Sequence, residues 1–348
     1  MMETMQSGQS GQGRQSRQAV ELDGLDRALV QALMIDGRVP FSRLAELLAV
    51  SDQTVIRRYR RLRGDGLIRV IGLPAGPRVG LAESWLRLQC LPDAALAVAD
   101  ALARRPDISW VTLNSGGTEV QCITKARTRE DHDELLLRRL PRTRRVTSIT
   151  AHSVLRSFTG GPQGWVGPGR LTEAQAVALA GPPVRTDGPV VRLDAAEQAM
   201  LTVLGSDGRA GFPELARAAG LSESTARRRL EQLRERGACY FDVEIDPRLL
   251  GMESRAALLI TVAPAQLAAV GAAVGGHPEV PFAAAITGSA NLLAIVLCRD
   301  NDGLYRYLTE RIGALTGVQH VEVVPQLRSI KRAGMLTDGY RLIDPPPA

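Results

Sequence analysis

Apolar residues recur at helical spacing near the start of the chain. Leu25, Leu29 and Leu33 are four residues apart, which places them on one face of a predicted helix. A second helix is predicted over 41–48, where apolar residues follow the same three- and four-residue steps. A tight turn comes next, and Ser51 is a suitable N-cap for a third helix.

The third predicted helix has two different faces. Val55, Tyr59 and Leu62 lie on one side, and polar or basic residues occupy the other: Gln53, Thr54, Arg57, Arg58 and Arg61. Two short helices, a tight turn and a third helix with a basic outer face form the helix-turn-helix pattern. A solvated helix face is the plain alternative, but the same pattern occurs twice in this chain.

The chain contains an internal duplication. Residues 22–66 align without a gap to residues 193–237, and 17 of the 45 pairs are identical. A weaker similarity follows each copy, and places Leu155-Arg156-Ser157 opposite Leu327-Arg328-Ser329. Because self-similarity at a fixed shift indicates a repeated structural unit, we predict that a unit of about 135 residues occurs twice.

Each copy continues into a short apolar stretch, either a wing or a connecting strand, and then into strand–helix–strand–strand–helix–strand order. In copy two we predict strands over 254–263, 280–288, 291–298 and 318–325 and helices over 264–275 and 301–314; in copy one, strands over 84–91, 109–115, 118–125 and 145–154. The predicted fold class is α+β, with two winged helix-turn-helix domains, each followed by a ferredoxin-like βαββαβ domain.

These patterns predict seven segments. They are a disordered tail (1–20), helix-turn-helix domain one (21–75), ferredoxin-like domain one (76–158), a Gly- and Pro-rich linker with one short helix (159–192), helix-turn-helix domain two (193–246), ferredoxin-like domain two (247–334) and a C-terminal tail (335–348).

Charge and cysteine usage narrow the function classes. The formal net charge is +6, and only two of the 43 basic residues are lysines. Arginine enrichment reflects either a GC-rich genome or phosphate binding, for which the planar guanidinium is suited. Four widely spaced cysteines exclude a disulfide-dense scaffold, and no apolar run predicts a secretion signal or a membrane span. We expect a cytoplasmic protein.

The motifs of both copies resemble the Lrp/AsnC family of transcription regulators. The motifs are Asp-Gly-Arg, Phe-x-x-Leu-Ala, Leu/Val-Ser-x-x-Thr-x-x-Arg-Arg and Leu-x-x-x-Gly, at 36–38, 41–45, 50–58 and 62–66 and again in 207–237. The resemblance implies double-stranded DNA as partner and an effector that is an amino acid or related metabolite. It also implies a homo-oligomer, in which each chain would resemble a family dimer with its two sensing domains paired.

The resemblance also assigns candidate site residues. The expected DNA-contacting residues are Ser51, Gln53, Thr54, Arg57, Arg58, Arg61, Ser222, Ser224, Thr225, Arg228 and Arg229. The family's Thr-Gly-x-x-Asp sensing turn corresponds to 287–291 and less closely to 115–119. The expected effector-binding residues are Thr287, Gly288, Ser289, Asn291, Gly116 and Glu119.

Two other functions remain open from the sequence. The tandem arrangement also resembles fused siroheme decarboxylases, but residues 107–112 and 279–284 lack the His, Tyr and Arg expected there. No catalytic set, cofactor motif or metal-ligand cluster is predicted. An effector-independent architectural DNA-binding protein is the other alternative.

Overall fold

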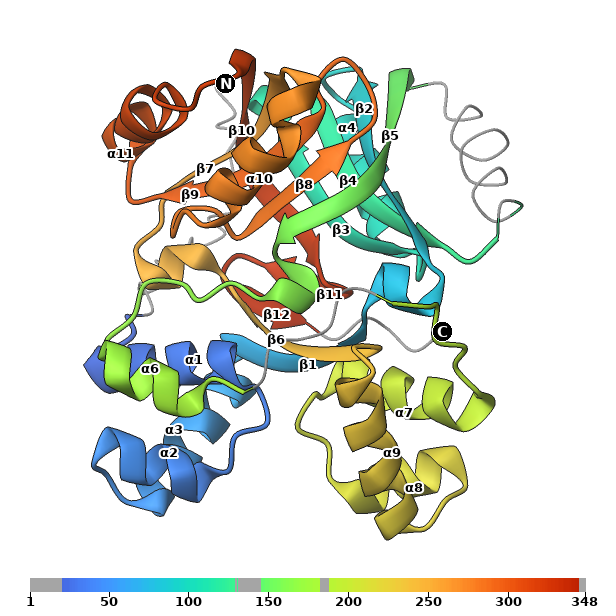
Figure 1. Cartoon of the computed structure of the whole chain (residues 1–348), viewed down its shortest axis with the longest axis vertical. Helices are drawn as coiled ribbons and strands as arrows, with labels where there is room; N and C mark the ends of the chain where they lie inside the picture. The colour runs from blue at the N-terminus through green and yellow to red at the C-terminus, as the bar shows by residue number, and fades with distance from the viewer. Residues whose placement is uncertain (1–20, 129, 131–144, 182–187, 344–348) are drawn as a thin grey trace, which may run out of the picture.

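The computed structural model describes residues 21–128, 130, 145–181 and 188–343. The expected N-terminal tail, residues 1–20, lies outside them. Figure 1 shows two helical units at one end of the molecule, a large strand layer at the other, and a two-stranded ribbon between them.

Each helical unit has three helices, as the sequence predicts. The first contains α1 (Gly24–Ile35), α2 (Phe41–Leu48) and α3 (Asp52–Gly64); the second contains α7 (Ala195–Ser206), α8 (Phe212–Ala219) and α9 (Glu223–Glu235). The turn before α3 uses Ala49 at φ 53°, and the turn before α9 uses Gly220 at φ 65°. These left-handed residues end one helix and redirect the chain into the next.

The strand after each helical unit joins the two units together. β1 (Ile68–Pro74) pairs antiparallel with β6 (Cys239–Ile245). Ile68 and Val243 belong to the core of the first unit, whereas Cys239 belongs to the core of the second. The stretches predicted as wings or connecting strands therefore form one shared ribbon, because each can bury its apolar face against both units.

The two ferredoxin-like domains merge into one closed barrel. Domain one supplies β2 (Ala82–Cys90), β3 (Ile108–Asn114), β4 (Glu119–Ala126) and β5 (Val146–Thr159); domain two supplies β7 (Ser254–Val262), β8 (Phe282–Ile286), β9 (Leu292–Cys298) and β10 (Val318–Arg332). The long strands β5 and β10 each pair with strands of both domains, β5 with β2 and β8, and β10 with β7 and β3. The sensing sheets thus pair within one chain.

Apolar side chains fill the barrel and its outer layer. The inner faces of the two sheets meet in a cluster that includes Trp85, Leu259 and Leu293. On the outside, α4 (Ala95–Ala103) covers domain one, and α10 (Leu267–Gly275) and α11 (Asn301–Arg306) cover domain two. Nearly continuous apolar strands such as β9 are expected where both faces are covered.

The segment expected as a C-terminal tail needs correction, whereas the short helix predicted in the linker is present. The C-terminal residues 335–343 are not a loose tail: β11 (Met335–Asp338) pairs with β10, and β12 (Arg341–Ile343) pairs with β11. Leu342 is buried and its amide donates to the Gly66 carbonyl, which explains why the segment is ordered. The linker's helix α6 (Glu173–Leu179) packs on α1, and buries Leu179 in the first helical unit.

Candidate nucleic-acid interface

The third helices begin where the sequence predicts them. The Ser51 hydroxyl accepts from the Thr54 amide at 3.2 Å, and the Ser222 hydroxyl accepts from the Thr225 amide at 3.3 Å. These N-caps satisfy amides that have no partner within the helix. Gln53 in the first turn of α3 is exposed, as is Ser224 in α9.

Three of the arginines expected to contact DNA are held by carboxylates of their own unit. Arg58 pairs with Asp23 and lies 3.0 Å from the Asp26 carboxylate. Arg61 also reaches Asp26, at 2.5 Å, and Arg229 pairs with Asp194 in the second unit. Because each carboxylate lies at the start of the unit's first helix, these contacts tie the third helix to the first.

The ion pairs lower the pKa of two partner carboxyl groups and engage the arginine charges. The hydrogen bond from Arg58 keeps the pKa of Asp23 below its ordinary value. The Glu197 amide and then Arg229 do the same for Asp194. Arg58, Arg61 and Arg229 therefore have carboxylate partners within their own units.

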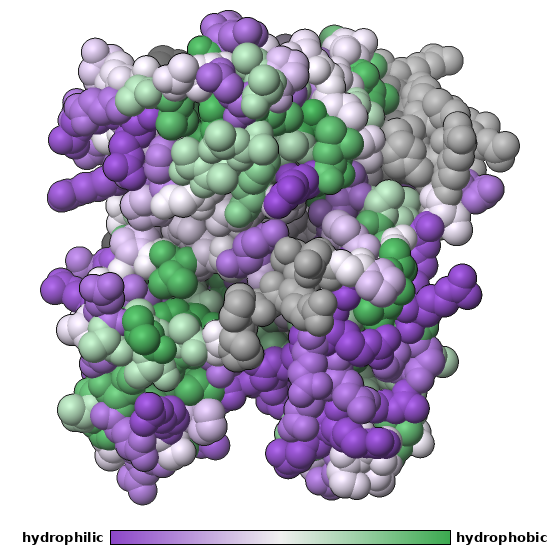
Figure 2. Space-filling view, viewed as in Figure 1, coloured by the Kyte–Doolittle hydropathy of each residue, from purple (hydrophilic) through white to green (hydrophobic). Residues whose placement is uncertain are grey.

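Other arginines of the third helices remain available. Arg57 and Arg60 in α3 and Arg228 in α9 are exposed, and no ion pair holds them within the described part of the chain. Arg227 is also exposed and stacks on Phe212 at 4.1 Å from the ring centre. Figure 2 shows the two helical units as separate lobes, the second of them mostly hydrophilic.

A reciprocal arginine contact holds the two helical units together. Arg38 donates to the carbonyls of Gly208 and Ala210 at 2.7 and 3.1 Å. Arg209, its counterpart in the duplication, donates to the carbonyls of Gly37 and Val39 at 2.7 and 2.9 Å. We call these four hydrogen bonds the arginine joint. Together with the shared β1–β6 ribbon, it holds the two units side by side.

The glycines of the Asp-Gly-Arg motifs allow this close approach. A Cβ atom on Gly208 would lie 2.7 Å from the Ile71 backbone, and one on Gly37 would lie 2.9 Å from a Val70 methyl. The preceding aspartate, Asp36, accepts from the Arg38 amide at 3.0 Å and shapes the turn. The repeated motif is therefore the contact between the units.

In the expected effector turn of domain two, some residues are exposed and one side chain is hydrogen-bonded to the neighbouring strand. Thr287, Gly288 and Ser289 are exposed. The Asn291 side chain instead accepts from the Val262 amide at 2.9 Å and donates to the Val262 carbonyl at 2.8 Å. Asn291 therefore fixes the end of β7.

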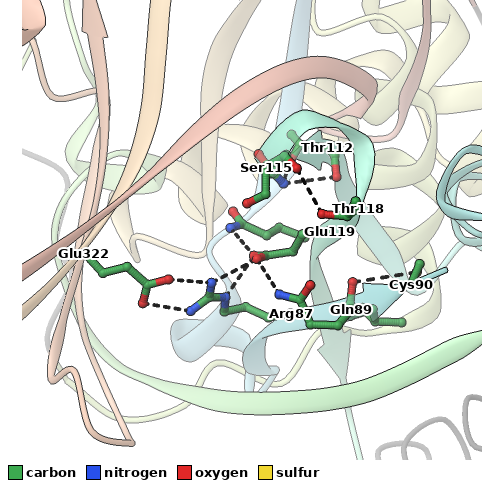
Figure 3. A network of polar contacts seen from close by, with 11 residues as sticks. Arg87, Gln89, Cys90, Thr112, Ser115, Thr118, Glu119 and Glu322 are labelled. Carbon is green, nitrogen blue, oxygen red and sulfur yellow. Dashed lines mark hydrogen bonds and ion pairs between the residues drawn. The ribbon is translucent and has the colours of Figure 1, made fainter. Parts of the chain in front are cut away.

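The corresponding turn of domain one contains a buried ionic cluster (Figure 3). Arg87 donates to both carboxylate oxygens of Glu119, at 2.8 and 2.9 Å, and Gln89 and Gln121 donate to the same carboxylate. Arg87 also reaches Glu322 of domain two at 2.8 Å. The Glu119 side chain is 1% exposed.

Glu119 is consequently a buried carboxylate whose hydrogen-bond partners are side chains of its own domain. Burial by itself would raise the pKa of Glu119, but the hydrogen bonds from Arg87 and Gln121 outweigh it and lower the pKa. Gly116, in contrast, lies on an exposed turn at φ 68°.

Comparisons with known proteins identify the family. The AsnC-type helix-turn-helix domain model matches residues 22–63 and 193–234, and the Lrp/AsnC ligand binding domain model matches 255–336. An uncharacterised HTH-type transcriptional regulator of Pyrococcus abyssi is 31% identical over 145 residues, which are 41% of this chain and 91% of that protein. The chain belongs to the Lrp/AsnC family.

This chain is also similar to a second transcription regulator and to one solved structure. The HTH-type transcriptional regulator FL11 of Pyrococcus horikoshii is 28% identical over 142 residues, covering 40% of this chain and 93% of FL11. The siroheme decarboxylase NirDL, solved with an iron-uroporphyrin III analogue, has a TM-score of 0.59 at 16% identity. The aligned region covers 88% of this chain and 93% of the NirDL chain, which shows a shared tandem fold.

The sequence alone did not reveal the contacts that hold the helices and the two helix-turn-helix units of this Lrp/AsnC chain together. The sequence shows Arg38 and Arg209, and Asp23 and Asp194, as identical pairs of the duplication, but it does not reveal their partners. Their recurrence at the same place in both copies was the available signal. Among the described residues, no helix could cross a bilayer and no group of three His, Cys, Asp or Glu is placed to hold a metal.

Proposed function

We propose that one chain binds two DNA half-sites at once, with α3 in one major groove and α9 in the next. The observation that carries this proposal is the arginine joint, which holds two helix-turn-helix units side by side in a single polypeptide. Paired recognition helices fit operators with two half-sites. Since α3 and α9 differ in sequence, the preferred operator is an imperfect palindrome.

Within each helix we assign different roles to neighbouring arginines. Arg57 and Arg228 contact phosphates or guanine edges, because they are exposed and without an ion pair in the described chain. At the start of each third helix, the hydroxyls of Ser51 and Thr54, and of Ser222 and Thr225, contact the DNA backbone. Arg58 and its counterpart orient the helix.

The test compares Arg57→Ala, Arg228→Ala and Arg58→Ala on an operator selected by the wild-type protein from random DNA. Arg57→Ala and Arg228→Ala should each flatten the dependence of log K on log salt by about one unit per lost phosphate contact. We expect the larger loss for Arg57→Ala, because the neighbouring Arg60 corresponds to Glu231 in α9. Arg58→Ala should mainly lower the thermal midpoint.

The matched control is Arg104→Ala, at an exposed arginine after α4 on the barrel. It should leave both the affinity and the salt slope unchanged. Wild-type affinity in Arg57→Ala and Arg228→Ala would remove α3 and α9 from the DNA interface.

We also propose that the exposed turn at Thr287–Ser289 binds the effector, with an amino acid as the effector class. The proposal is supported by the family's sensing motif and by the exposure of Ser289. A ligand present at about 100 times its Kd should stabilise the native protein by about 2.7 kcal/mol.

Thermal denaturation with a panel of amino acids measures that stabilisation. Ser289→Trp should abolish it, whereas Thr118→Trp in the turn of domain one should not. Failure of every amino acid to shift the wild-type midpoint would favour an effector-independent architectural protein.

We favour regulation over decarboxylation despite the shared fold with NirDL. Where the resemblance places the decarboxylase's His, Tyr and Arg, this chain has Trp110 in β3 and buried alanines such as Ala283 in β8. None of these side chains can deliver a proton. As a DNA-binding regulator, the chain would act in the cytoplasm with the chromosome. A tetrapyrrole absorbance in the purified protein would contradict this assignment.

A further inference from the structure

The shared ribbon has a polar face towards the barrel. In β6, Val243 and Ile245 pack into the core of the first helical unit. Side chains alternate between the two faces of a strand, so Asp242 and Glu244 lie on the opposite face. The Glu244 carboxylate lies 3.2 Å from the guanidinium of Arg332, at the end of β10. The ribbon that joins the helix-turn-helix units therefore also contacts a strand that closes the barrel (Figure 1).

Glu244 and Arg332 are buried charges with incomplete hydrogen bonding. Glu244 is 3% exposed and Arg332 is 7% exposed. Glu244 Oε2 and the Nε and Nη1 atoms of Arg332 make no well-aligned hydrogen bond within the described chain. The guanidinium lies over Trp110 of β3, at 5.8 Å from the ring centre. An ion pair with so few hydrogen bonds only partly offsets the cost of removing two charges from water, so the contact depends strongly on its charge state.

The contact contains two carboxyl groups for one guanidinium. Burial raises the pKa of Glu244; Arg332 offsets part of this rise, and the charge of Asp242 adds to it. Burial also raises the pKa of Asp242, against the Val243 amide and Arg332. Two carboxylates that share one buried guanidinium cannot both ionise at low cost. The pair therefore keeps a proton at a higher pH than two separate carboxyl groups would.

The charged groups around this pair, from β2, β4, β7 and the turn after β6, have ion pairs of their own. They are Glu83 with Lys125, and Asp246 with Arg248 and Arg255. Arg69 is opposite Glu244 in the ribbon, and with Asp207 it lines the space between the helical units. Tyr240 stays neutral, because burial raises its pKa well above the ordinary value. Proton uptake at this contact therefore involves Asp242 and Glu244.

The duplication shows that the acidic pair is not needed to form the ribbon. In β1 the positions of Asp242 and Glu244 are occupied by Ile71 and Leu73, and Ile71 is fully buried. The counterpart of Arg332 in copy one is Gly160. An apolar face would stabilise the contact at every pH. The three charged residues occur once per chain, and they add a dependence on protons that docking by itself does not require.

We propose that Asp242, Glu244 and Arg332 form a proton-responsive junction between the sensing barrel and the ribbon that carries both helix-turn-helix units. With one proton on the carboxyl pair, the remaining carboxylate is matched by Arg332 and the ribbon stays docked. When the pH rises and both carboxyl groups ionise, the unmatched buried charge loosens the docking. Only a resulting pH dependence of operator binding would rest on the proposed function.

Urea denaturation of the full chain between about pH 5 and pH 9 measures the proton linkage. The folded pKa values are raised above the ordinary values of 3.8 and 4.5, so the folded state binds more protons than the unfolded state. This term therefore lowers the stability as the pH rises. The equilibrium constant of unfolding should increase by up to about tenfold per pH unit, and level off above the folded pKa values.

Two variants should change this profile in opposite directions. Asp242→Asn keeps the pair of Glu244 with Arg332 and removes the unmatched charge. It should flatten the profile and be at least as stable as wild type at alkaline pH. Arg332→Met leaves two carboxyl groups without a guanidinium, and should steepen the profile. It is compared with wild type from the acid end, where both carboxyl groups are protonated and the fold is retained. Glu173→Gln, at an exposed position of α6, is the control and should change nothing.

Hydrogen exchange tests whether the opening is local. The Leu342 amide donates to the Gly66 carbonyl at 2.7 Å, and links the C-terminal hairpin to the first helical unit. As the pH rises, its exchange should accelerate beyond the intrinsic pH dependence, and by more than that of Leu293 inside the barrel. Asp242→Asn should remove this difference.

A pH profile that both Asp242→Asn and Arg332→Met leave unchanged would overturn the junction. Equal acceleration at Leu342 and Leu293 would also overturn it, because the opening would then be global. None of these measurements uses DNA, so their outcome is separate from the tests of Arg57 and Arg228.

Discussion

Replacing Arg38 and Arg209 together by alanine is expected to weaken binding to a two-half-site operator by about 10²-fold or more. The four hydrogen bonds of the arginine joint, at 2.7–3.1 Å, hold the two helix-turn-helix units in one arrangement. Without them, the units stay joined by the β1–β6 ribbon, but the second unit is held less firmly. The advantage of having both recognition helices in one fixed arrangement would then be reduced.

Fluorescence anisotropy with one-site and two-site DNA separates this effect from unfolding. Affinity for a single half-site should stay near the wild-type value, because each unit keeps its own core. Arg38→Lys with Arg209→Lys is the matched variant: it keeps the charge but removes the fork that bridges two carbonyls. We expect it to behave like the alanine pair. An equal loss on one-site and two-site DNA would show that the joint does not set the spacing.

Arg87→Met is expected to destabilise the protein by about 3–5 kcal/mol, because it leaves a buried carboxylate without its charge partner. Glu119 is 1% exposed and receives two hydrogen bonds from Arg87. Glu322→Gln is the matched control, since that side chain is 46% exposed and an exposed ion pair contributes about 0–1 kcal/mol. Urea denaturation measures both. Equal losses would contradict the assignment of Glu119 as the critical charge.

The same cluster predicts a pH dependence. The pKa of Glu119 is lower in the folded state than its ordinary value of 4.5, so its stabilisation is complete above that value. It is lost as the pH falls through the folded pKa, where the carboxylate becomes protonated. In Arg87→Met the difference in stability from wild type should therefore shrink at acid pH. A difference that does not depend on pH would contradict this linkage.

The sequence by itself determined the local elements and their duplication. Four-residue apolar spacing located α1, and Ser51 and Ser222 marked the starts of α3 and α9. These features depend on residues a few positions apart, whose relation is set by the helix itself. The gapless repeat likewise required no knowledge of packing.

Tertiary structure decided which charges are available and how the copies meet. Arg58 and Arg57 are neighbours in sequence, yet only Arg58 meets Asp23, which lies 35 residues away. Arg38 finds its carbonyl partners 170 and 172 residues away. Glu119 finds Arg87 on the neighbouring strand, 32 residues away, and Arg87 in turn reaches Glu322 of the other domain. The pattern of one helix specifies which side chains point outward, but not which distant carboxylate packs beside them. That choice depends on how the cores of both copies pack against a shared ribbon and barrel.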